Sequence, residues 1–135
     1  MRISTKGIYA LEAMIELSSR DEGNVSIRDI AEARNCSVKY LEQLFNRLKK
    51  ADLIKSVRGK DGGYQLAKQP ECISAKDVIL AVEDSMDPVS CLSEKCERSS
   101  ICPTKSIWLG IQNEIYQVLE NKNLKYLSEV YKREG

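Results

Sequence analysis

The sequence contains no histidine, one phenylalanine and one tryptophan. The absence of histidine excludes a histidine general base and every zinc site that uses imidazole. No run approaches the roughly 18 consecutive apolar residues that suggest a membrane span, and residues 1–19 lack the unbroken apolar stretch of a signal peptide. We therefore expect a cytoplasmic protein without a membrane partner. In that compartment its five cysteines are free thiols or metal ligands rather than disulfides.

The formal charge is only +1, but it is unevenly distributed along the 135 residues. Residues 1–68 hold 13 basic and 9 acidic side chains, whereas residues 69–135 hold 8 basic and 11 acidic ones. Between Val38 and Lys60 there are seven basic residues and two acidic ones. A basic stretch in a nearly neutral chain is typical of a phosphate-binding surface, although a solvated helix face gives the same count.

The first half of the chain has the apolar periodicity and the cap residues of three helices. Residues 6–19 place their apolar side chains on one helical face, and turn residues follow. Ser26 and Ser37 are the expected N-caps of two further helices, over about residues 27–34 and 38–51. Two short helices joined by a turn of a few residues are typical of a helix-turn-helix.

A short hairpin is predicted directly after the third helix. Residues 53–58 and 64–67 have the spacing of strands, and between them Gly59–Gly63 supplies glycines for the positive φ angles of a hairpin loop. A helix-turn-helix followed by a basic hairpin is a winged helix. The expected fold is therefore mainly α with a small β-hairpin wing, and residues 1–85 form its DNA-binding domain.

The second half of the chain predicts a further short helix and a long one. Ser74 is the expected N-cap of a helix that ends at Asp87-Pro88. Residues 86–102 form a cysteine-rich loop without periodicity. Residues 103–135 contain a long helix over Pro103–Asn121 and a short last helix. The small domain has little core left to cover the long helix. We expect a homodimer built on the apolar stripe of this helix. The alternative is an ordinary core helix. The stripe consists of Ile107, Trp108, Ile111, Ile115 and Val118.

The third helix predicts a DNA-reading surface. With Leu41 at the centre of the buried side, the opposite side and its flanks present Lys39, Glu42, Gln43, Asn46, Arg47 and Lys50. Amide and charged side chains of these types read base edges in the major groove, and later basic residues contact phosphate. Arg58 and Lys60 are the basic residues of the wing, where a guanidinium can enter a narrow minor groove. The alternatives are a solvated protein-binding face and a simple phosphate contact by Arg58.

Three of the cysteines form a cluster in the sequence. Cys91, Cys96 and Cys102 lie in a segment without helix or strand periodicity. Thiolates are soft ligands that suit iron–sulfur clusters, zinc or copper, and irregular backbone lets three sulfurs converge. Structural zinc is less favoured because no fourth cysteine or histidine is near, while free thiols or a reversible disulfide remain open. Cys36 and Cys72 lie outside this cluster.

The chain resembles the winged-helix regulators typified by the iron–sulfur cluster regulator, the nitric-oxide-sensing repressor and the cysteine-metabolism repressor. The stretches that carry the resemblance are Met1–Gly7, Tyr40–Leu44, Ser56–Gly59, Gly62–Tyr64 and the three cysteines. The resemblance implies a non-enzymatic transcription repressor, a homodimer that binds double-stranded DNA with a partly palindromic operator. It also implies that Cys91, Cys96 and Cys102 ligate a [2Fe–2S] or [4Fe–4S] cluster.

The chain departs from this family at the fourth ligand. Lys105 stands where one branch has histidine, and Ile8 stands where another has aspartate. Several candidates for the fourth ligand remain. They are a small exogenous thiol, an oxygen of Glu94, Glu97 or Thr104, and an oxygen from a partner chain, such as that of Glu12. The alternative function is a cluster-free repressor of the cysteine-metabolism type, controlled by a partner protein or by thiol redox state.

Overall fold

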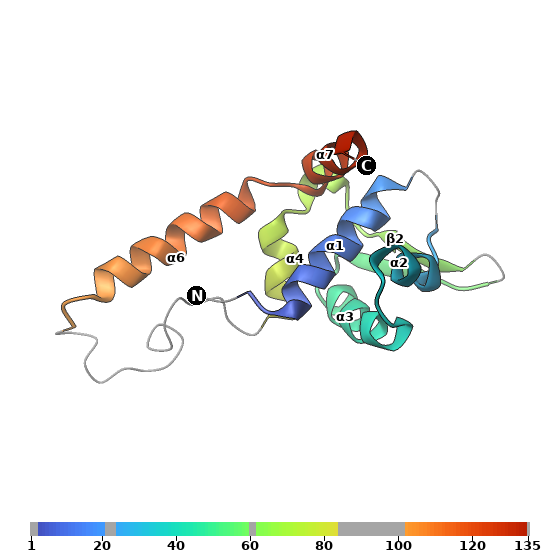
Figure 1. Ribbon diagram of the computed structural model, residues 1–135, viewed down its shortest axis with the longest axis horizontal. Helices are drawn as coiled ribbons and strands as arrows, with labels where there is room; N and C mark the ends of the chain where they lie inside the picture. The colour runs from blue at the N-terminus through green and yellow to red at the C-terminus, as the bar shows by residue number, and fades with distance from the viewer. Residues whose placement is uncertain (1–2, 21–23, 60–61, 84–101, 135) are drawn as a thin grey trace.

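The computed structural model describes residues 3–20, 24–59, 62–83 and 102–134, and its element order is that of a winged helix-turn-helix (Figure 1). The elements are α1 (Thr5–Ser19), α2 (Ile27–Arg34), α3 (Val38–Lys50), β1 (Ile54–Val57), β2 (Gly63–Leu66), the 3-10 helix η1 (Pro70–Cys72), α4 (Ala75–Val82), α6 (Lys105–Glu120) and α7 (Leu124–Glu134). The predicted fold class, mainly helical with a hairpin wing and a long helix near the C-terminus, is confirmed.

Side-chain caps start three of the helices. The hydroxyls of Ser26 and Ser37 each accept a hydrogen bond from the backbone N–H three residues further on, at 3.2 and 3.1 Å. Ser74 and Asp77 form a reciprocal capping box at the start of α4. These bonds satisfy N–H groups that have no partner inside the helix. Asn35 ends α2 in the left-handed conformation, with φ 54°. The N-caps predicted from the sequence at Ser26, Ser37 and Ser74 are confirmed.

Two predicted helix ends are wrong. α4 ends at Val82, where the C-cap Glu83 is extended (φ −96°, ψ 140°), whereas the expected end at Asp87-Pro88 lies outside the described residues. α6 begins at Lys105, with Thr104 as its N-cap, so Pro103 lies outside the helix and not at its first position.

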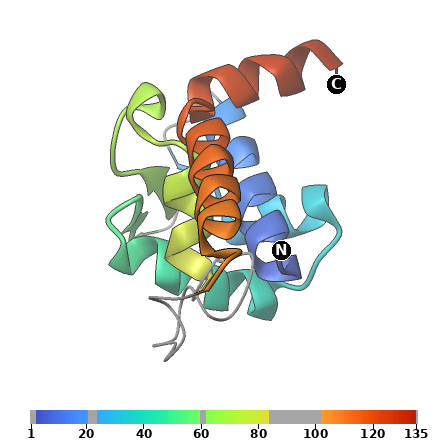
Figure 2. The same ribbon diagram turned by 90° about the vertical axis from the view of Figure 1, so that its left-hand side faces the viewer.

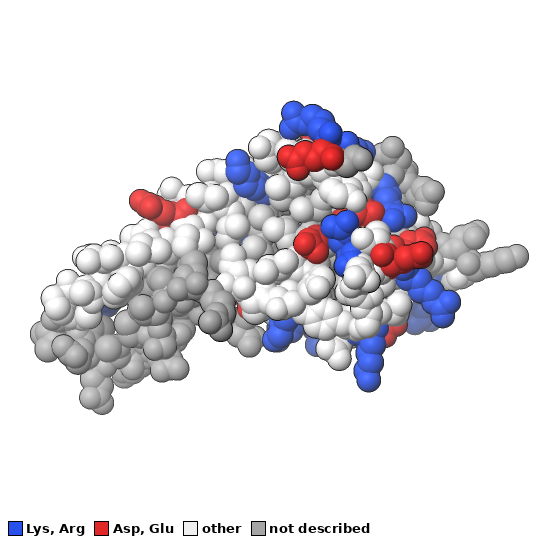
Figure 3. Space-filling model, in the orientation of Figure 1, with Lys and Arg blue, Asp and Glu red and all other residues white. Residues whose placement is uncertain are grey.

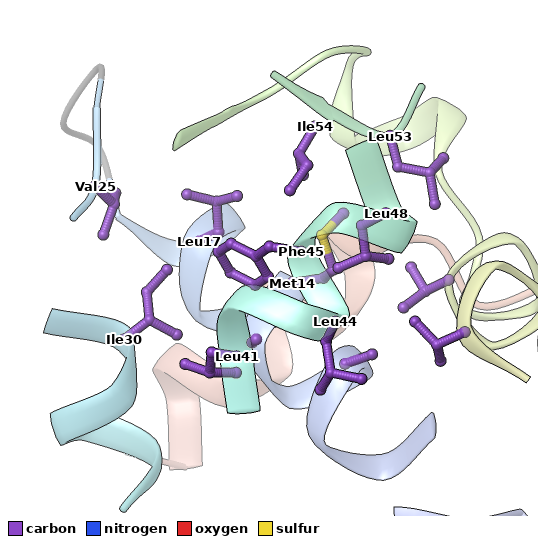
Figure 4. Close-up of a cluster of buried hydrophobic side chains, with 14 of the residues drawn as sticks. Met14, Leu17, Val25, Ile30, Leu41, Leu44, Phe45, Leu48, Leu53 and Ile54 are labelled. Carbon is purple, nitrogen blue, oxygen red and sulfur yellow. The ribbon is translucent and has the colours of Figure 1, made fainter. Parts of the chain in front are cut away.

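The core is centred on the inner face of α3. Leu41, Leu44, Phe45 and Leu48 are each at most 2% exposed. Figure 4 shows Phe45 among side chains from α1 and α3, next to Met14 and Leu17. Its ring meets the Tyr64 ring of the hairpin edge to face, with centroids 4.8 Å apart. The hairpin is thus packed directly onto the helix that it accompanies.

A further short segment pairs with one edge of the hairpin. Val25 forms an antiparallel bridge with Tyr64 through two backbone hydrogen bonds of 3.0 and 2.8 Å. A Cβ on Gly63 would lie 2.4 Å from the Val25 carbonyl oxygen, so only glycine permits this approach. Gly59 has the positive φ expected of the loop, at +122°. Gly63, in contrast, is needed for space rather than for its dihedral angle.

Helix α7 returns to the N-terminal part of the molecule. The buried Leu124 donates its N–H to the Ile73 carbonyl at 2.9 Å. Glu16 of α1 is only 6% exposed and pairs with Arg20 at 3.0 Å and with Arg34 at 3.9 Å. A hydrogen bond to the Glu16 carboxylate also raises the pKa of Tyr131 in α7, because it holds the phenol proton. Leu124 of α7 therefore packs into the same core cluster as residues of α1 and α4.

Helix α6 extends away from the rest of the molecule in Figure 1, and in Figure 2, turned by 90°, it lies in front of the other helices. Its C-terminal half contacts α4, where Lys76 lies 5.0 Å from the centre of the Tyr116 ring and 3.9 Å from Glu120. None of its residues is fully buried. Ile107 is 54% exposed and Val118 is 59% exposed, so α6 has no place in the core of the single chain.

We predict opposite stability effects for two glycine-to-alanine changes. Gly63→Ala forces a methyl group against the Val25 backbone and should lower the free energy of unfolding by about 1–3 kcal/mol. Gly110→Ala meets no atom within 4 Å on α6 and should raise it by roughly 0.5–1 kcal/mol, because alanine has the higher helix propensity. Urea titration measures both. An unchanged Gly63→Ala midpoint would contradict the close approach.

Candidate nucleic-acid interface and cysteine segment

The outer face of α3 is polar and open to solvent because its inner face is buried. The exposed side chains are those of Lys39, Glu42, Gln43, Asn46, Lys49 and Lys50. Three of the last four residues of the helix are basic. On the face shown in Figure 3, Lys and Arg side chains project along the edge where α3 lies in Figure 1.

The wing stands beside this face. Arg58 is exposed and follows β1 directly, while Lys60 lies outside the described residues. Lys49 donates from Nζ to the Ser56 hydroxyl of β1 at 3.1 Å and so connects α3 to the hairpin. Sequence reasoning missed this contact, because a lysine at the end of a basic helix has no local signal for a specific partner.

Arg47, expected on the flank of the exposed face, makes a contact that sequence reasoning did not foresee. Its side chain is half-buried, and its Nη1 donates a hydrogen bond to the backbone carbonyl of Val82 at the end of α4. This contact ties the side chain of Arg47 to the end of α4.

A second contact at the end of α4 was not foreseen. The Glu83 carboxylate accepts hydrogen bonds from the Ser4 N–H at 3.0 Å, the Ser4 hydroxyl and the Gly7 N–H at 3.1 Å. It caps α1, whose own N-cap residue makes no side-chain cap bond. A Cβ on Gly7 would lie 2.8 Å from Glu83 Oε1. The available sequence signal was Gly7 itself, a glycine inside an apolar helical pattern.

Of the three clustered cysteines, only Cys102 is in the described part of the chain. It is half-buried, and its Sγ lies 3.5 Å from the Thr104 hydroxyl. That hydroxyl also accepts a hydrogen bond of 3.0 Å from Trp108 Nε1. Cys91 and Cys96, and with them Glu94 and Glu97, lie outside the described residues. Within the described ranges, no group of three or more potential metal ligands is present.

The two other cysteines have different surroundings. Cys72 is exposed on η1, and Cys36 is half-buried in the turn before α3. Burial raises the pKa of the Cys36 thiol, and the negative charge of Glu12 raises it further, against the opposing effect of Arg34. A raised pKa lowers the thiolate fraction near neutral pH.

The two positions at which the chain departs from the family resemblance, Lys105 and Ile8, both lie within the described residues. Lys105 is the first residue of α6 and is half-buried. Ile8 is 50% exposed on α1. It lines a surface depression of about 530 Å³ together with Glu12 and Arg34. Glu12 is the acidic residue among those that line this depression.

The fold and the exposed faces of α3 and the hairpin define a winged-helix DNA-binding regulator of transcription. No helix in the described ranges is long and apolar enough to span a membrane. The sequence profile of the Rrf2 family, described as an iron-dependent transcriptional regulator, matches residues 3–129. The chain belongs to this family.

Individual relatives agree with this assignment. The chain is 40% identical over 129 residues to the HTH-type transcriptional regulator IscR of Erwinia tasmaniensis, covering 94% of this chain and 78% of the relative. It is 39% identical over 126 residues to a regulator from Azotobacter vinelandii named ORF2, covering 92% and 77% of the two chains. These relatives are transcriptional regulators and not enzymes, as the sequence predicted.

Solved structures show the same fold in two kinds of regulator. CymR, the global cysteine regulator of B. subtilis, has a TM-score of 0.80 and 39% identity, covering 96% of this chain and 98% of that one. The IscR of T. potens has a TM-score of 0.81 and 38% identity, covering 97% and 88%. The oxidised form of Staphylococcus aureus CymR has a TM-score of 0.77 and 43% identity, covering 96% and 97%.

Proposed function

We propose that this protein is a transcriptional repressor whose affinity for its operator is controlled by an iron–sulfur cluster bound to Cys91, Cys96 and Cys102. The observation that carries the proposal is the presence of these three thiols between α4 and α6. Soft thiolates suit iron, and the family is described as iron-dependent. Thr104 is the nearest described candidate for the fourth ligand, since its hydroxyl lies 3.5 Å from Cys102 Sγ. When bound, the cluster would supply redox and ligand-exchange chemistry.

We propose that the exposed face of α3 reads the operator in the major groove. The amides of Gln43 and Asn46 match adenine, and Lys39 and Glu42 match guanine and cytosine. Lys50, at the end of the helix, contacts phosphate. Arg58 and Lys60, the basic residues of the wing, enter or border the minor groove. The burial of the opposite face supports this assignment, because it fixes which side chains face outward.

We propose that α6 is the dimerisation helix. Its stripe of Ile107, Trp108, Ile111, Ile115 and Val118 is exposed or half-buried in the single chain. Water-exposed apolar side chains at helical spacing are stabilised when a second apolar face covers them. A second copy of this chain provides such a face and also gives the two-fold symmetry that a partly palindromic operator requires.

A cluster-free regulator is the second candidate function. The chain matches nearly the full length of the two CymR structures, one of which is described as a cysteine regulator and the other as an oxidised form. In this alternative the same cysteines act as redox-active thiols, or a partner protein controls DNA binding. Iron content separates the two candidates.

We predict that Gln43→Ala and Asn46→Ala each weaken operator binding by roughly 1–3 kcal/mol and relax the preference at one base position. Neither side chain is charged, so binding to scrambled DNA should change little. Lys50→Ala should weaken both DNAs alike and lower the salt slope by about one unit. Titrations of operator and scrambled DNA at several salt concentrations measure these effects. Wild-type operator affinity in both amide variants would refute the proposed reading face.

We predict that Arg58→Ala, measured in the same titrations, weakens A·T-rich sites most if its guanidinium enters the minor groove. Equal losses on operator and scrambled DNA would make the wing a phosphate contact only.

We predict that protein purified without oxygen is brown, because thiolate-bound iron absorbs visible light. Cysteine-to-alanine changes at Cys91, Cys96 or Cys102 should remove the colour. Cys72→Ala is the matched control, since this exposed thiol lies outside the cluster and the colour should persist. Stoichiometric zinc, or colourless protein without iron from iron-replete cells, would rule out the cluster. Colourless protein that still binds the operator would favour the second candidate function.

We predict that Val118→Glu converts a dimer into a monomer, because it places a charge within the exposed apolar stripe of α6. Gln117→Glu adds the same charge at the neighbouring exposed position, outside the stripe, and should remain dimeric. Sedimentation at micromolar concentration measures both, with circular dichroism to verify folding. A wild-type monomer, or a dimeric Val118→Glu variant, would contradict the proposed interface.

A further inference from the structure

The end of α4 is held by two elements that are distant in sequence. Arg47 of α3 donates to the carbonyl of Val82, which is the last residue of α4. The next residue, Glu83, caps α1 through Ser4 and Gly7. Two consecutive residues therefore connect α4 to the proposed recognition helix and to the first helix of the fold.

Physical chemistry favours the Arg47 contact over an open position. The last carbonyls of a helix have no partner inside it, and the helix dipole makes this end negative. A guanidinium placed there makes a charge-assisted hydrogen bond, which is stronger than a neutral one. The half-buried side chain has fewer water molecules competing for its donors than Lys49 or Lys50, which are exposed on the same helix.

The contact lies directly before the segment that contains two of the clustered cysteines. The segment that carries Cys91 and Cys96 follows Glu83. The Val82 carbonyl and the Glu83 carboxylate belong to the two residues from which that segment continues, and they contact α3 and α1 respectively. The inner face of α3 is packed too tightly to yield independently of its neighbours.

We infer that Arg47 is a positioning residue for DNA recognition and not a phosphate contact: by holding the end of α4 it sets the placement of α3 and links it to the cysteine segment. The positioning role does not depend on the proposed cluster, whereas the link to the cysteine segment rests on the proposed function. The two parts are tested by separate measurements.

The first measurement uses cluster-free protein and compares Arg47→Lys and Arg47→Met with Lys50→Met. A lysine retains the charge of a phosphate contact but not the fork and reach of arginine. Arg47→Lys and Arg47→Met should both bind the operator roughly tenfold more weakly, as when one base contact is lost, with scrambled-DNA affinity and salt slope unchanged. Lys50→Met should lower the salt slope by about one unit. Thermal unfolding verifies that each variant is folded.

Two results would overturn the positioning role. One is Arg47→Lys with wild-type operator affinity, because a phosphate contact tolerates this change. The other is Arg47→Met with a salt slope lowered by about one unit and equal losses on operator and scrambled DNA. Either result would show that Arg47 contacts a DNA phosphate.

The second measurement compares the operator affinities of protein reconstituted with iron and sulfide and of the cluster-free form. In wild type the two affinities should differ. In Arg47→Met and in Glu83→Gln, which weakens the cap on α1, their ratio should move toward one. Equal affinities in wild type would refute control by the cluster and the link with it, and the salt measurement would still decide the role of Arg47. An unchanged ratio in both variants would refute the link alone.

Discussion

The burial of one face of α3 is the constraint on which the rest of the structure depends. Leu41, Leu44, Phe45 and Leu48 are nearly inaccessible to water, and large core side chains of this kind each contribute several kcal/mol when compared with alanine. α1 supplies the layer beneath them, and the hairpin adds Tyr64 against Phe45. With one face fixed in this way, the polar face must point to solvent. The surface available to DNA is thus a consequence of the core and needs no separate stabilisation.

The parts that could be predicted from the sequence depend on neighbours along the chain. Ser26, Ser37 and Ser74 bond groups three residues away, so a short window of sequence contains both partners. Arg47 and Glu83 find their partners 35 and 79 residues away, and no local pattern distinguishes them from solvated charges. The outward direction of Gln43 and Asn46 followed from helical periodicity alone, whereas the contact of Arg47 with Val82 depended on where α4 ends.

The two C-terminal helices, α6 and α7, are attached to the rest of the molecule in different ways. α7 is fixed by the buried Leu124 and by charges around Glu16, a carboxylate that tolerates burial because two arginines lie beside it. α6 has only its C-terminal half against α4, and its apolar stripe is uncovered. The N-terminal end of α6 follows Cys102 and Thr104 directly, so the proposed thiol ligand and the proposed dimer interface would share this end of the helix.

The cap of α1 by Glu83 has a consequence for the growing polypeptide. Ser4 and Gly7 are synthesised before their partner, because the carboxylate that completes their hydrogen bonds is added 79 residues after Ser4. At the usual rates of synthesis this delay lasts seconds, much longer than the submicrosecond formation of a helix. During that time the first turn of α1 keeps N–H groups that only water can satisfy. Nascent α1 is thus expected to fray at its start until α4 has been synthesised and has docked.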